Sequence, residues 1–364
     1  MSLRPKREIA SLKKGHHGGI NYAEIEALGI NPNEVLDFSV CTNPFMQPPG
    51  IKKTLGAIAI EQYPDSEATE FCKKLSARLG VPIENILAGS GTTELIRLIA
   101  LTYFRKGDPI LLPEPTYGEY ETACLAVGAR PVRHRAKEED SLAPKIANIT
   151  DLIQKHHPRG IFICNPNNPT GKYLSRREIE TVLEAAGDSL LILDEAYVEF
   201  VAESWNSVDL MAWGNVIILR SMTKAYGIPG LRLGYAVADK DIVKNLRRVC
   251  PPWNVNIIAQ KVGTAVLENE EHFKQSQLKI MEAKRFLTTA LSRLGYEVLP
   301  SDAHYFLVKV GNARDFRNAL LRHGIMVRDC TSFGLPEYVR MAPRTLPECE
   351  KLITAIGNLR PDNK

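Results

Sequence analysis

The chain has 364 residues, of which 44% are hydrophobic and 24% charged, and its formal net charge is +4. This composition is that of an ordinary globular protein, and the length favours about two domains. Lysine and arginine are interspersed with acidic residues, without a long basic block. The charge pattern therefore argues against a nucleic-acid partner, whereas a small anionic ligand fits the mild positive charge.

The cysteines, the hydropathy and the first residues together predict a cytoplasmic protein. Seven cysteines are present and none forms a C-x-x-C pair, which favours free thiols in a reducing compartment. No apolar run approaches the roughly 18 residues of a membrane span, so we expect no membrane partner. The opening stretch MSLRPKREIASLKKG has no apolar core and is not a secretory signal. The histidines lack metal-ligand spacing, so we expect no metal.

The first part of the chain predicts an N-terminal segment followed by a large α/β domain. Residues 1–49 are rich in Gly, Pro and Asn, with one short apolar piece, EVLDFSV. From about residue 85, short runs rich in Ile, Leu and Val alternate with helical patterns such as TELIRLIALTYFRKG and SRREIETVLEAAG. The runs are NILAG, PILLP, GIFIC, LLILD, NVIIL and LGYAVA. This alternation predicts a mostly parallel sheet covered on both faces by helices, in a domain spanning 50–252.

The stretch CPPWN at 250–254 breaks this rhythm and predicts a domain junction. A long helical pattern follows, at about 257–294. Then come the expected strand HYFLVKV, the helix ARDFRNALLRH, the strands IMVRD and YVRMA, and a last helix near 347–358. These elements predict a small α+β domain spanning 253–364.

Polar and basic side chains follow the strands of the large domain. Because the carboxyl ends of parallel strands meet at one edge, where open α/β sheets bind ligands, we expect these side chains to gather there. The set comprises Ser90, Gly91, Thr92, Tyr117, Asn168, Asp194, Tyr197, Ser221, Lys224 and Arg232. Each member has a simpler alternative: Asp194 fits a helix N-cap, NPNNPTG fits a turn, and Lys224 fits a solvated surface. Those alternatives do not account for the joint arrangement.

One chemistry accounts for the whole set. A lysine bonds covalently to an aldehyde cofactor, and an aspartate keeps a pyridine nitrogen protonated so that the ring accepts electrons. Asn and Tyr bind the ring's phenolic oxygen, an aromatic ring stacks on its face, and hydroxyls, a helix N-terminus and an arginine bind a phosphate. The cofactor with these needs is pyridoxal 5′-phosphate. Lys224 must then be desolvated or lie near cations, because a free lysine amine is mostly protonated at neutral pH.

The stretches NPNNPTG, LDEAYVEF and SMTKAYGIPGLRLGY closely resemble the fold type I, class I/II aminotransferase family, over nearly the whole chain. The resemblance implies the fold of the pyridoxal-phosphate-dependent transferases, with a large, mostly parallel sheet domain and a small α+β domain. It also implies a role for each residue. Lys224 would bind the cofactor covalently, Asp194 its pyridine nitrogen, Asn168 and Tyr197 its phenolic oxygen, Tyr117 its ring face, and Ser90, Gly91, Thr92, Ser221 and Arg232 its phosphate. Lys224, Asp194 and Tyr197 would be catalytic.

The stretch YPDSEATEF resembles the family segment that reaches across a dimer. The resemblance therefore implies a homodimer with shared active sites, in which Tyr63 touches the cofactor phosphate of the partner's site. A non-catalytic binding protein on the same fold is a further alternative, which the joint retention of Lys224, Asp194 and Arg232 disfavours.

Two subfamilies share PTYGEY and NPNNPTG: the histidinol-phosphate aminotransferases and the threonine-phosphate decarboxylases of cobalamin synthesis. The stretches HHGGINYAE, VLDFSVCTNPF and MVRDCTSFGLPEYVRMAPR resemble the decarboxylases. Arg344 stands where the aminotransferases usually have glycine, although a surface ion pair also fits this arginine. The resemblance thus favours a lyase that decarboxylates L-threonine O-3-phosphate, with a histidinol-phosphate-type aminotransferase as the alternative.

The substrate in either case is a small phosphorylated amine or amino acid. Arg328 and Arg340 end the two strands IMVRD and YVRMA, and a guanidinium fork suits carboxylates and phosphates. We expect these two arginines to bind the substrate's anionic groups, with His17 as a further phosphate ligand and Asn43 and Asn168 in the pocket. The chain departs from the decarboxylase pattern at Ile20 and at CTNP (41–44), which leaves the exact substrate open.

Overall fold

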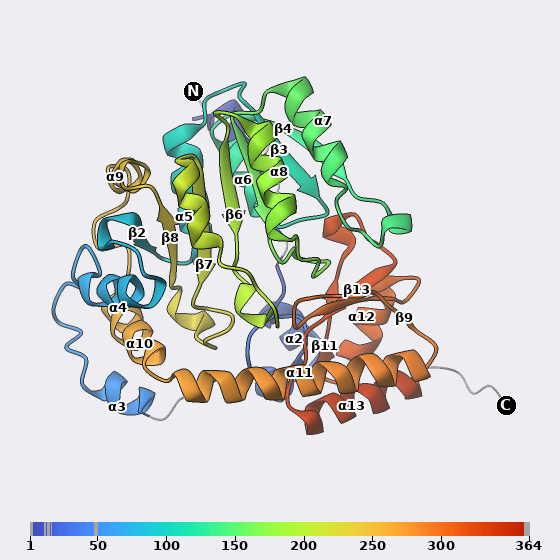
Figure 1. Ribbon diagram of the computed structural model, residues 1–364. Coiled ribbons are helices and arrows are strands. Elements are labelled where there is room, and N and C mark those ends of the chain that lie inside the picture. Colours follow the sequence, from blue (N-terminus) through green and yellow to red (C-terminus); the bar gives the residue numbers. More distant parts are fainter. Residues whose placement is uncertain (1–2, 11, 13–14, 16, 47–49, 360–364) are drawn as a thin grey trace.

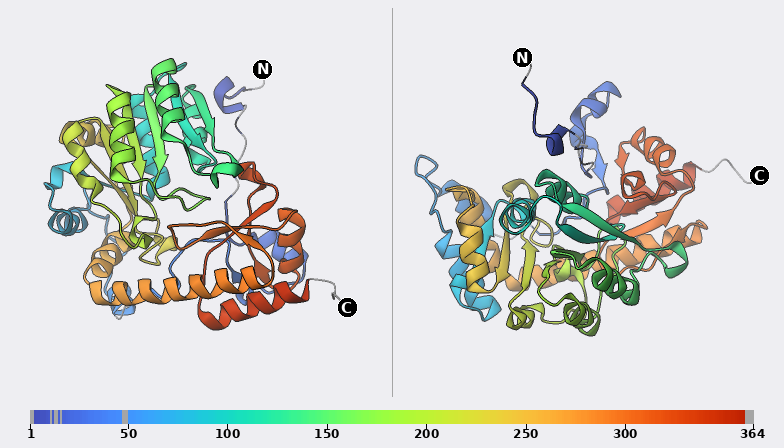
Figure 2. Two further views of the ribbon diagram at one scale, coloured as in Figure 1. Left: turned by 45° about the vertical axis from the view of Figure 1, so that its right-hand side comes forward. Right: turned by 90° about the horizontal axis from the view of Figure 1, so that it is seen from above.

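In the computed structural model, residues 3–10, 12, 15, 17–46 and 50–359 are described. Figure 1 shows a large sheet between helices and, below it, a smaller α+β unit, with one long helix running beneath both. The left view of Figure 2 shows the same long helix as a common base. No helix of the described residues is long and apolar enough to cross a membrane.

The large sheet has seven strands in the order β2-β8-β7-β6-β5-β3-β4. All neighbours pair in parallel except those of β8, which is antiparallel to both β2 and β7. The predicted mostly parallel sheet is thereby confirmed. The strands are β2 (Ile86–Gly89), β3 (Pro109–Glu114), β4 (Arg130–Arg135), β5 (Gly160–Cys164), β6 (Leu190–Asp194), β7 (Val216–Ser221) and β8 (Gly234–Ala238).

Helices cover both faces of this sheet because its strands are apolar on both sides. Ile163, Leu193 and Ile218 belong to the core on one face, whereas their chain neighbours Phe162, Ile192 and Ile217 belong to the core on the other. This alternation is the period-two geometry of a strand. The first face is covered by α4 (Thr69–Leu79), α7 (Ile146–His156), α8 (Arg176–Ala186) and α10 (Ile257–Leu267), and the second by α5 (Thr92–Tyr103), α6 (Glu119–Ala126) and α9 (Lys240–Arg247).

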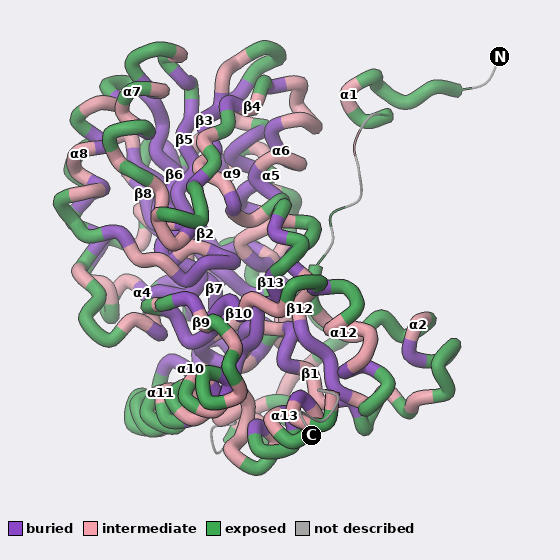
Figure 3. Tube along the Cα trace, turned by 90° about the vertical axis from the view of Figure 1, so that its right-hand side faces the viewer, coloured by how far each residue is buried: buried purple, intermediate pink, exposed green. Residues whose placement is uncertain are grey.

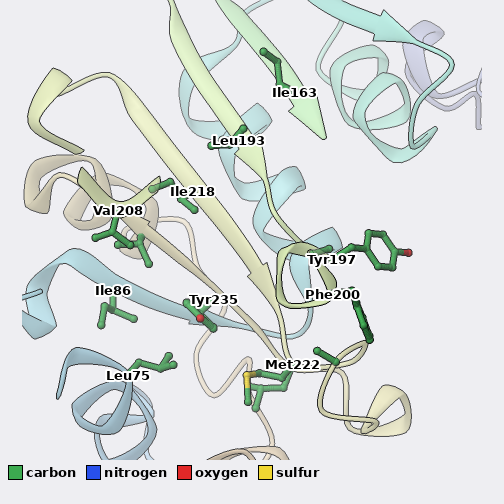
Figure 4. Packing of buried hydrophobic residues seen from close by; sticks show 14 of the residues in the cluster. Leu75, Ile86, Ile163, Leu193, Tyr197, Phe200, Val208, Ile218, Met222 and Tyr235 are labelled. Atoms are coloured by element: carbon green, nitrogen blue, oxygen red, sulfur yellow. The ribbon is translucent and has the colours of Figure 1, made fainter. Parts of the chain in front are cut away.

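Figure 4 shows the first of these cores at close range. Leu75 of α4 lies towards Ile86 of β2. Ile218 of β7 and Leu193 of β6 belong to the same core, further across the sheet. Figure 3 shows the strands as the most continuously buried part of the chain, with exposed segments on the outer helices. The buried strands therefore form a rigid base for the loops that follow their carboxyl ends.

The small domain contains a four-stranded antiparallel sheet in the order β12-β13-β10-β9. Its strands are β9 (Glu297–Val298), β10 (Phe306–Lys309), β12 (Arg328–Asp329) and β13 (Tyr338–Met341), and its helices are α11 (Glu270–Arg293), α12 (Ala313–Leu321) and α13 (Leu346–Asn358). The expected strand IMVRD divides in two. Its first half, β11 (Ile325–Met326), pairs in parallel with β1 (Leu36–Asp37) of the N-terminal segment.

The remaining elements lie at the edges of these two units. They are the helices α1 (Arg7–Ala10), α2 (Tyr22–Ala27) and α3 (Ile51–Gly56) and the 3-10 turns η1 (Pro32–Glu34), η2 (Ile83–Asn85), η3 (Glu138–Asp140), η4 (Val198–Phe200), η5 (Ser207–Trp213), η6 (Pro229–Leu231) and η7 (Thr331–Phe333). The division expected after residue 252 stays a prediction. Packing favours a later one, inside α11, because Ile280 belongs to the core of the large sheet and Ala283 to that of the small domain.

Candidate active site

Lys224 lies three residues beyond the end of β7, at the carboxyl edge of the large sheet. Its backbone is fixed, since its carbonyl accepts hydrogen bonds from the N–H groups of Asn43 (2.9 Å) and Gly227 (3.2 Å). Its Nζ lies 5.9 Å from the centre of the Tyr197 ring. Burial lowers the pKa of Lys224, so its amine loses a proton more readily than an exposed lysine does. Such an amine is suited to nucleophilic attack on an aldehyde.

Most of the predicted residues meet in one cavity around this lysine, here named the cofactor cavity. Its walls come from the loops after five strands, as expected of an open α/β sheet. The lining includes Thr92, Tyr117, Asn168, Asp194, Tyr197, Ser221, Lys224 and Arg232. A second, wider cavity, here named the substrate cavity, shares Tyr117, Asn168, Tyr197 and Lys224 and adds His17, Arg328 and Arg340. The structure thus brings these side chains together at one edge of the sheet, and their roles stay predictions.

Asp194 is the last residue of β6, and it is almost wholly buried. Its Oδ2 accepts a hydrogen bond from the hydroxyl of Tyr120 (2.7 Å), and its Oδ1 accepts one from the backbone N–H of Ala196 (3.0 Å). The bond from Ala196 is the local contact that the helix-cap alternative for Asp194 requires. The bond from Tyr120 joins residues far apart in the chain, and a helix cap does not account for it. Burial raises the pKa of Asp194 to about 6, against the opposing effect of Tyr120. A buried carboxylate of this kind is completed by a cationic partner.

The far end of the cofactor cavity is built for an anion. Gly91 precedes α5 with a φ of 79°, and a Cβ added there would lie 2.8 Å from Nη2 of Arg232. The positive φ favours glycine here, and the guanidinium lies close to this backbone. Thr92 begins α5, and Ser221 shares a hydrogen bond of 2.7 Å with Thr223. Hydroxyls, an arginine and a helix N-terminus at one place form a phosphate site.

Ser90 contributes differently from the prediction. Its backbone N–H donates to Oε2 of Glu94 (2.6 Å), and it lines an open groove beside the cofactor cavity together with Arg232 and Thr93. Tyr117 stands between this groove and the two cavities, and its hydroxyl shares a hydrogen bond of 3.1 Å with Thr93.

Asn43 does not line either cavity. Its Nδ2 donates to the carbonyl of Ala225 (3.1 Å) and to Ser276 (2.8 Å), and its Oδ1 accepts from the N–H of Phe45 (3.0 Å). Because these bonds occupy the amide, we assign to Asn43 the support of the loop around Lys224 rather than the predicted contact with substrate. The motif resemblance located the segment but could not show which way its side chains face.

Tyr63 likewise lies outside both cavities of its own chain. It is 78% exposed, and its ring stacks on Trp253 with centroids 4.4 Å apart. An exposed aromatic pair is uncommon on a monomer surface and is typical of interfaces. This position agrees with the predicted contact in a partner's site, which stays a prediction.

Arg340 and Arg328 face the substrate cavity from the small domain. Arg340 is 5% exposed; its Nη1 bonds Asn168 and its Nη2 donates to the carbonyl of Ser39 (2.7 Å). Its Nε is buried without a partner among the described residues. Arg328 is half-buried, donates to Ser332 (2.7 Å) and lies over the ring of Phe333. Arg340 is thus a fixed cation in a desolvated wall, which is a site for an anion.

His17 reaches the substrate cavity from the N-terminal segment. Its Nε2 lies 3.1 Å from Oε1 of Glu119, and its side chain is 52% exposed. Arg344, in contrast, is not among the lining residues: it pairs with Glu348 one turn along α13 (2.8 Å). The ion-pair alternative for Arg344 is therefore supported.

Sequence reasoning missed several residues of the site. Tyr120 and Glu119 both lie in PTYGEY, next to the predicted Tyr117, and Cys41 and Ser39 lie in VLDFSVCTNPF. A Tyr three residues after Tyr117 on a helix start was a usable signal, since residues three apart share a helix face. No local signal identified the carbonyl of Ser39 as the support of Arg340.

The chain matches the family model "Aminotransferase class I and II" over residues 33–356. The chain belongs to this family. It is 36% identical over 304 residues to the histidinol-phosphate aminotransferase of Moorella thermoacetica, covering 82% of this chain and 78% of that protein. Two solved structures extend the comparison. The L-threonine-O-3-phosphate decarboxylase of Porphyromonas gingivalis is 30% identical with a TM-score of 0.77, covering 88% of this chain and 98% of that one. The histidinol-phosphate aminotransferase of Sinorhizobium meliloti, in complex with pyridoxal 5′-phosphate, shares the fold, with a TM-score of 0.88, 20% identity and 99% of each chain covered.

The protein is accordingly an enzyme of the aminotransferase family that depends on pyridoxal 5′-phosphate, and its cavity fits this cofactor. The Gly91–Arg232 cradle suits the phosphate, and buried Asp194 suits a protonated pyridine nitrogen. Lys224 would hold the aldehyde, and Asn168 and Tyr197 would hold the phenolic oxygen. When bound, the cofactor withdraws electrons from the bond that breaks at the substrate's α-carbon.

Proposed function

We propose that this enzyme exchanges an amino group between a small phosphorylated amine and a keto acid, as a histidinol-phosphate-type aminotransferase does. The observation that supports the anionic substrate is the pair Arg328 and Arg340, and the choice of amino transfer rests on the relative at 36% identity. The two are direct partners across antiparallel β12 and β13, so their side chains leave the same face of the sheet, and both line the cavity of Lys224. Like charges placed directly opposite destabilise a sheet. An anionic ligand between them removes that cost.

The two arginines differ in their burial and in the groups that hold them. Arg340 is held on both sides by Asn168 and Ser39, so it fits a planar carboxylate or one face of a phosphate in a fixed position. Arg328 is less buried and reaches the mouth of the cavity. A dicarboxylic keto acid such as 2-oxoglutarate presents two negative charges as well. The amino donor and the amino acceptor can therefore use the same pair of arginines in turn.

The enzyme's own residues then perform proton transfer and exclusion of water. Nζ of Lys224, which burial favours in the neutral form, accepts the proton from the substrate's α-carbon and later returns it. Asp194 supplies a fixed negative charge at the base of the cofactor cavity. Buried Tyr197 and partly buried Tyr117 occupy space that water would otherwise fill.

A second candidate is the decarboxylation of L-threonine O-3-phosphate, which the sequence ranked first. Two observations favour it: His17 and Gly18, from the stretch that resembles the decarboxylases, line the substrate cavity, and the solved decarboxylase is 30% identical to this chain. We rank amino transfer before decarboxylation because the relative at 36% identity is a histidinol-phosphate aminotransferase. Arg344 is also a weaker argument for the decarboxylase, since its guanidinium forms an ion pair with Glu348.

We propose in addition that the active enzyme is a homodimer. The exposed Tyr63–Trp253 pair and the open groove at Ser90, Thr93 and Arg232 are the surfaces that support this assembly. The cytoplasmic location stays a prediction.

Product analysis tests the proposed reaction. The holoenzyme is supplied with histidinol phosphate or L-threonine O-3-phosphate, each with and without 2-oxoglutarate. We expect glutamate from histidinol phosphate only when 2-oxoglutarate is present. Release of carbon dioxide from threonine phosphate without a keto acid, and no glutamate from histidinol phosphate, would instead establish the second candidate.

A further inference from the structure

The described part of the N-terminal segment contacts both domains beside the substrate cavity. α1 packs against α6 of the large domain, whereas Ile25 of α2 packs against Leu321 and Met326 of the small domain. Figure 3 and the left view of Figure 2 show these two helices well apart. Residues 17–19, here named the N-terminal strap, line the substrate cavity or the polar hollow beside it.

The strap is attached at one end to the large domain and at the other to the part of the N-terminal segment that follows β1. At one end, Nε2 of His17 lies 3.1 Å from Oε1 of Glu119, the first residue of α6. At the other, the N–H of Gly19 donates to Oγ of Ser39 (2.8 Å). The strap also lies against the chain beneath it: a Cβ added at Gly18 would come within 2.6 Å of the Ser39 carbonyl oxygen. That same oxygen accepts a hydrogen bond from Arg340.

Glu119 has the properties of an anchor for the first end. Only 7% of its side chain is exposed, and each carboxylate oxygen has a partner, His17 on Oε1 and Arg97 on Oε2 (3.1 Å). A buried carboxylate with two cationic or donor partners keeps a fixed position. A Cβ added at Gly15, two residues before the strap, would lie 2.9 Å from Oε1, so the backbone of Gly15 also approaches the carboxylate.

We propose that Glu119 is a positioning residue: it orients His17 towards the phosphate of the bound substrate and holds the N-terminal strap over the substrate cavity. The inference rests on the proposed phosphorylated substrate. One ring nitrogen of His17 faces the Glu119 carboxylate, and the other is left to contact the phosphate. Because the side chain of His17 is more than half exposed, its ring depends on the contact with Glu119 for a defined orientation. Glu119 acts on the substrate through His17.

Steady-state kinetics of four holoenzymes test the orienting role: the parent, Glu119→Ala, His17→Gln and the double variant. Histidinol phosphate and histidinol serve as the paired substrates. We expect each single variant to raise KM for histidinol phosphate about tenfold, as for loss of a hydrogen bond to a charged group, with KM for histidinol and kcat nearly unchanged. The double variant should be no worse than the single variants. Glu119→Gln, which keeps the shape and one acceptor, should restore part of the loss.

Independent effects that multiply in the double variant would overturn the proposal, since Glu119 would then act without His17. The matched control is Glu180→Gln, which removes an exposed ion-pair carboxylate on α8 and should leave both KM values unchanged. Equal KM values for histidinol phosphate and histidinol in the parent would contradict the phosphorylated substrate itself. In that case, hydrogen exchange at the Gly19 amide still tests whether Glu119 holds the strap, because this measurement needs no substrate. The exchange rate should increase about tenfold in Glu119→Ala, and an unchanged rate would overturn the anchoring role.

Discussion

The hydroxyl of Tyr120 donates a hydrogen bond of 2.7 Å to Oδ2 of Asp194, and both groups are buried. The bond connects α6 to the end of β6 beneath the cofactor cavity. Burial raises the pKa of Asp194 to about 6, and the donation from Tyr120 opposes this rise. Tyr120 therefore helps to keep the carboxylate ionised, which is the form that holds a protonated pyridine nitrogen.

Replacing Tyr120 with phenylalanine tests this relationship. Without the donor, the pKa of Asp194 should rise further, by about one unit, because a hydrogen bond to a charged group is worth on the order of 1.5 kcal/mol. An ionised carboxylate is needed, so the acid limb of the kcat–pH profile should move to higher pH while activity at high pH is retained. Asp194→Ala is the control and should lose several orders of magnitude at every pH. An unmoved acid limb would contradict the role of Tyr120.

Lys224→Ala should abolish covalent attachment of the cofactor. The buried amine is the nucleophile that the cofactor cavity offers at the end of β7. After borohydride reduction, mass spectrometry of the parent should locate the cofactor on the peptide that contains Lys224, and the variant should show no adduct and no turnover. Lys172→Ala, a substitution outside both cavities, is the control and should keep the adduct. A persisting adduct in Lys224→Ala would reject the assignment.

Two inactive variants should complement each other if active sites are shared. Tyr63 is exposed on its own chain and is not among the residues that line its cavities. In a heterodimer of Tyr63→Ala and Lys224→Ala, one of the two sites regains both residues. Mixed and refolded subunits should therefore recover up to about a quarter of the parent activity, as expected when half of the dimers are heterodimers with one intact site. A monomeric mass by light scattering at full activity would contradict the shared site.

The buried carboxylate of Glu199 should make stability depend on pH. Its Oε2 is buried without a partner among the described residues, and burial raises the pKa of Glu199 to about 7 from 4.5. The folded protein thus binds this proton more tightly than the unfolded chain, so the group lowers stability as pH rises through that window. Glu199→Gln should raise the free energy of unfolding by about 1–3 kcal/mol at pH 8, and by much less at pH 5.

Urea unfolding at the two pH values measures this difference. Exposed Glu203→Gln is the matched control and should change stability equally at both. If Glu199→Gln raises the free energy of unfolding equally at pH 5 and pH 8, the ionised carboxylate of Glu199 is not what lowers stability at high pH.

Strands with continuous apolar runs could be predicted from the sequence, because burial on both faces leaves a signal in every residue. β4 was not predicted, since it is the edge strand and its residues Arg130, Arg133 and Arg135 are exposed, which leaves no continuous apolar run. The stretch IMVRD was expected as one strand. It divides because β11 pairs with β1, almost three hundred residues earlier, and no local pattern reports such a partner.

The site shows the same limit. Lys224, Asp194 and Arg340 could be predicted, because each lies within, at the end of, or just after an apolar strand and its chemistry is distinctive. Tyr120 and Glu119 were missed, although their motif was recognised, since their partners Asp194 and His17 are 74 and 102 residues away in the chain. Side-chain direction was also beyond the sequence: Asn43 lies in a segment next to the substrate cavity, yet its amide faces Ala225 and Ser276.

The central claim is that Arg328 and Arg340, opposite each other in the sheet, bind the phosphate of a phosphorylated amine next to Lys224. Titration of the holoenzyme, followed by the absorbance of its cofactor, tests this most directly. Histidinol phosphate should bind at least about a hundredfold more tightly than histidinol, and Arg328→Met should remove most of that difference, because loss of one partner of a buried charge pair costs about 2–5 kcal/mol. Equal affinity for the two compounds in the parent, or an unchanged preference in Arg328→Met, would contradict the account.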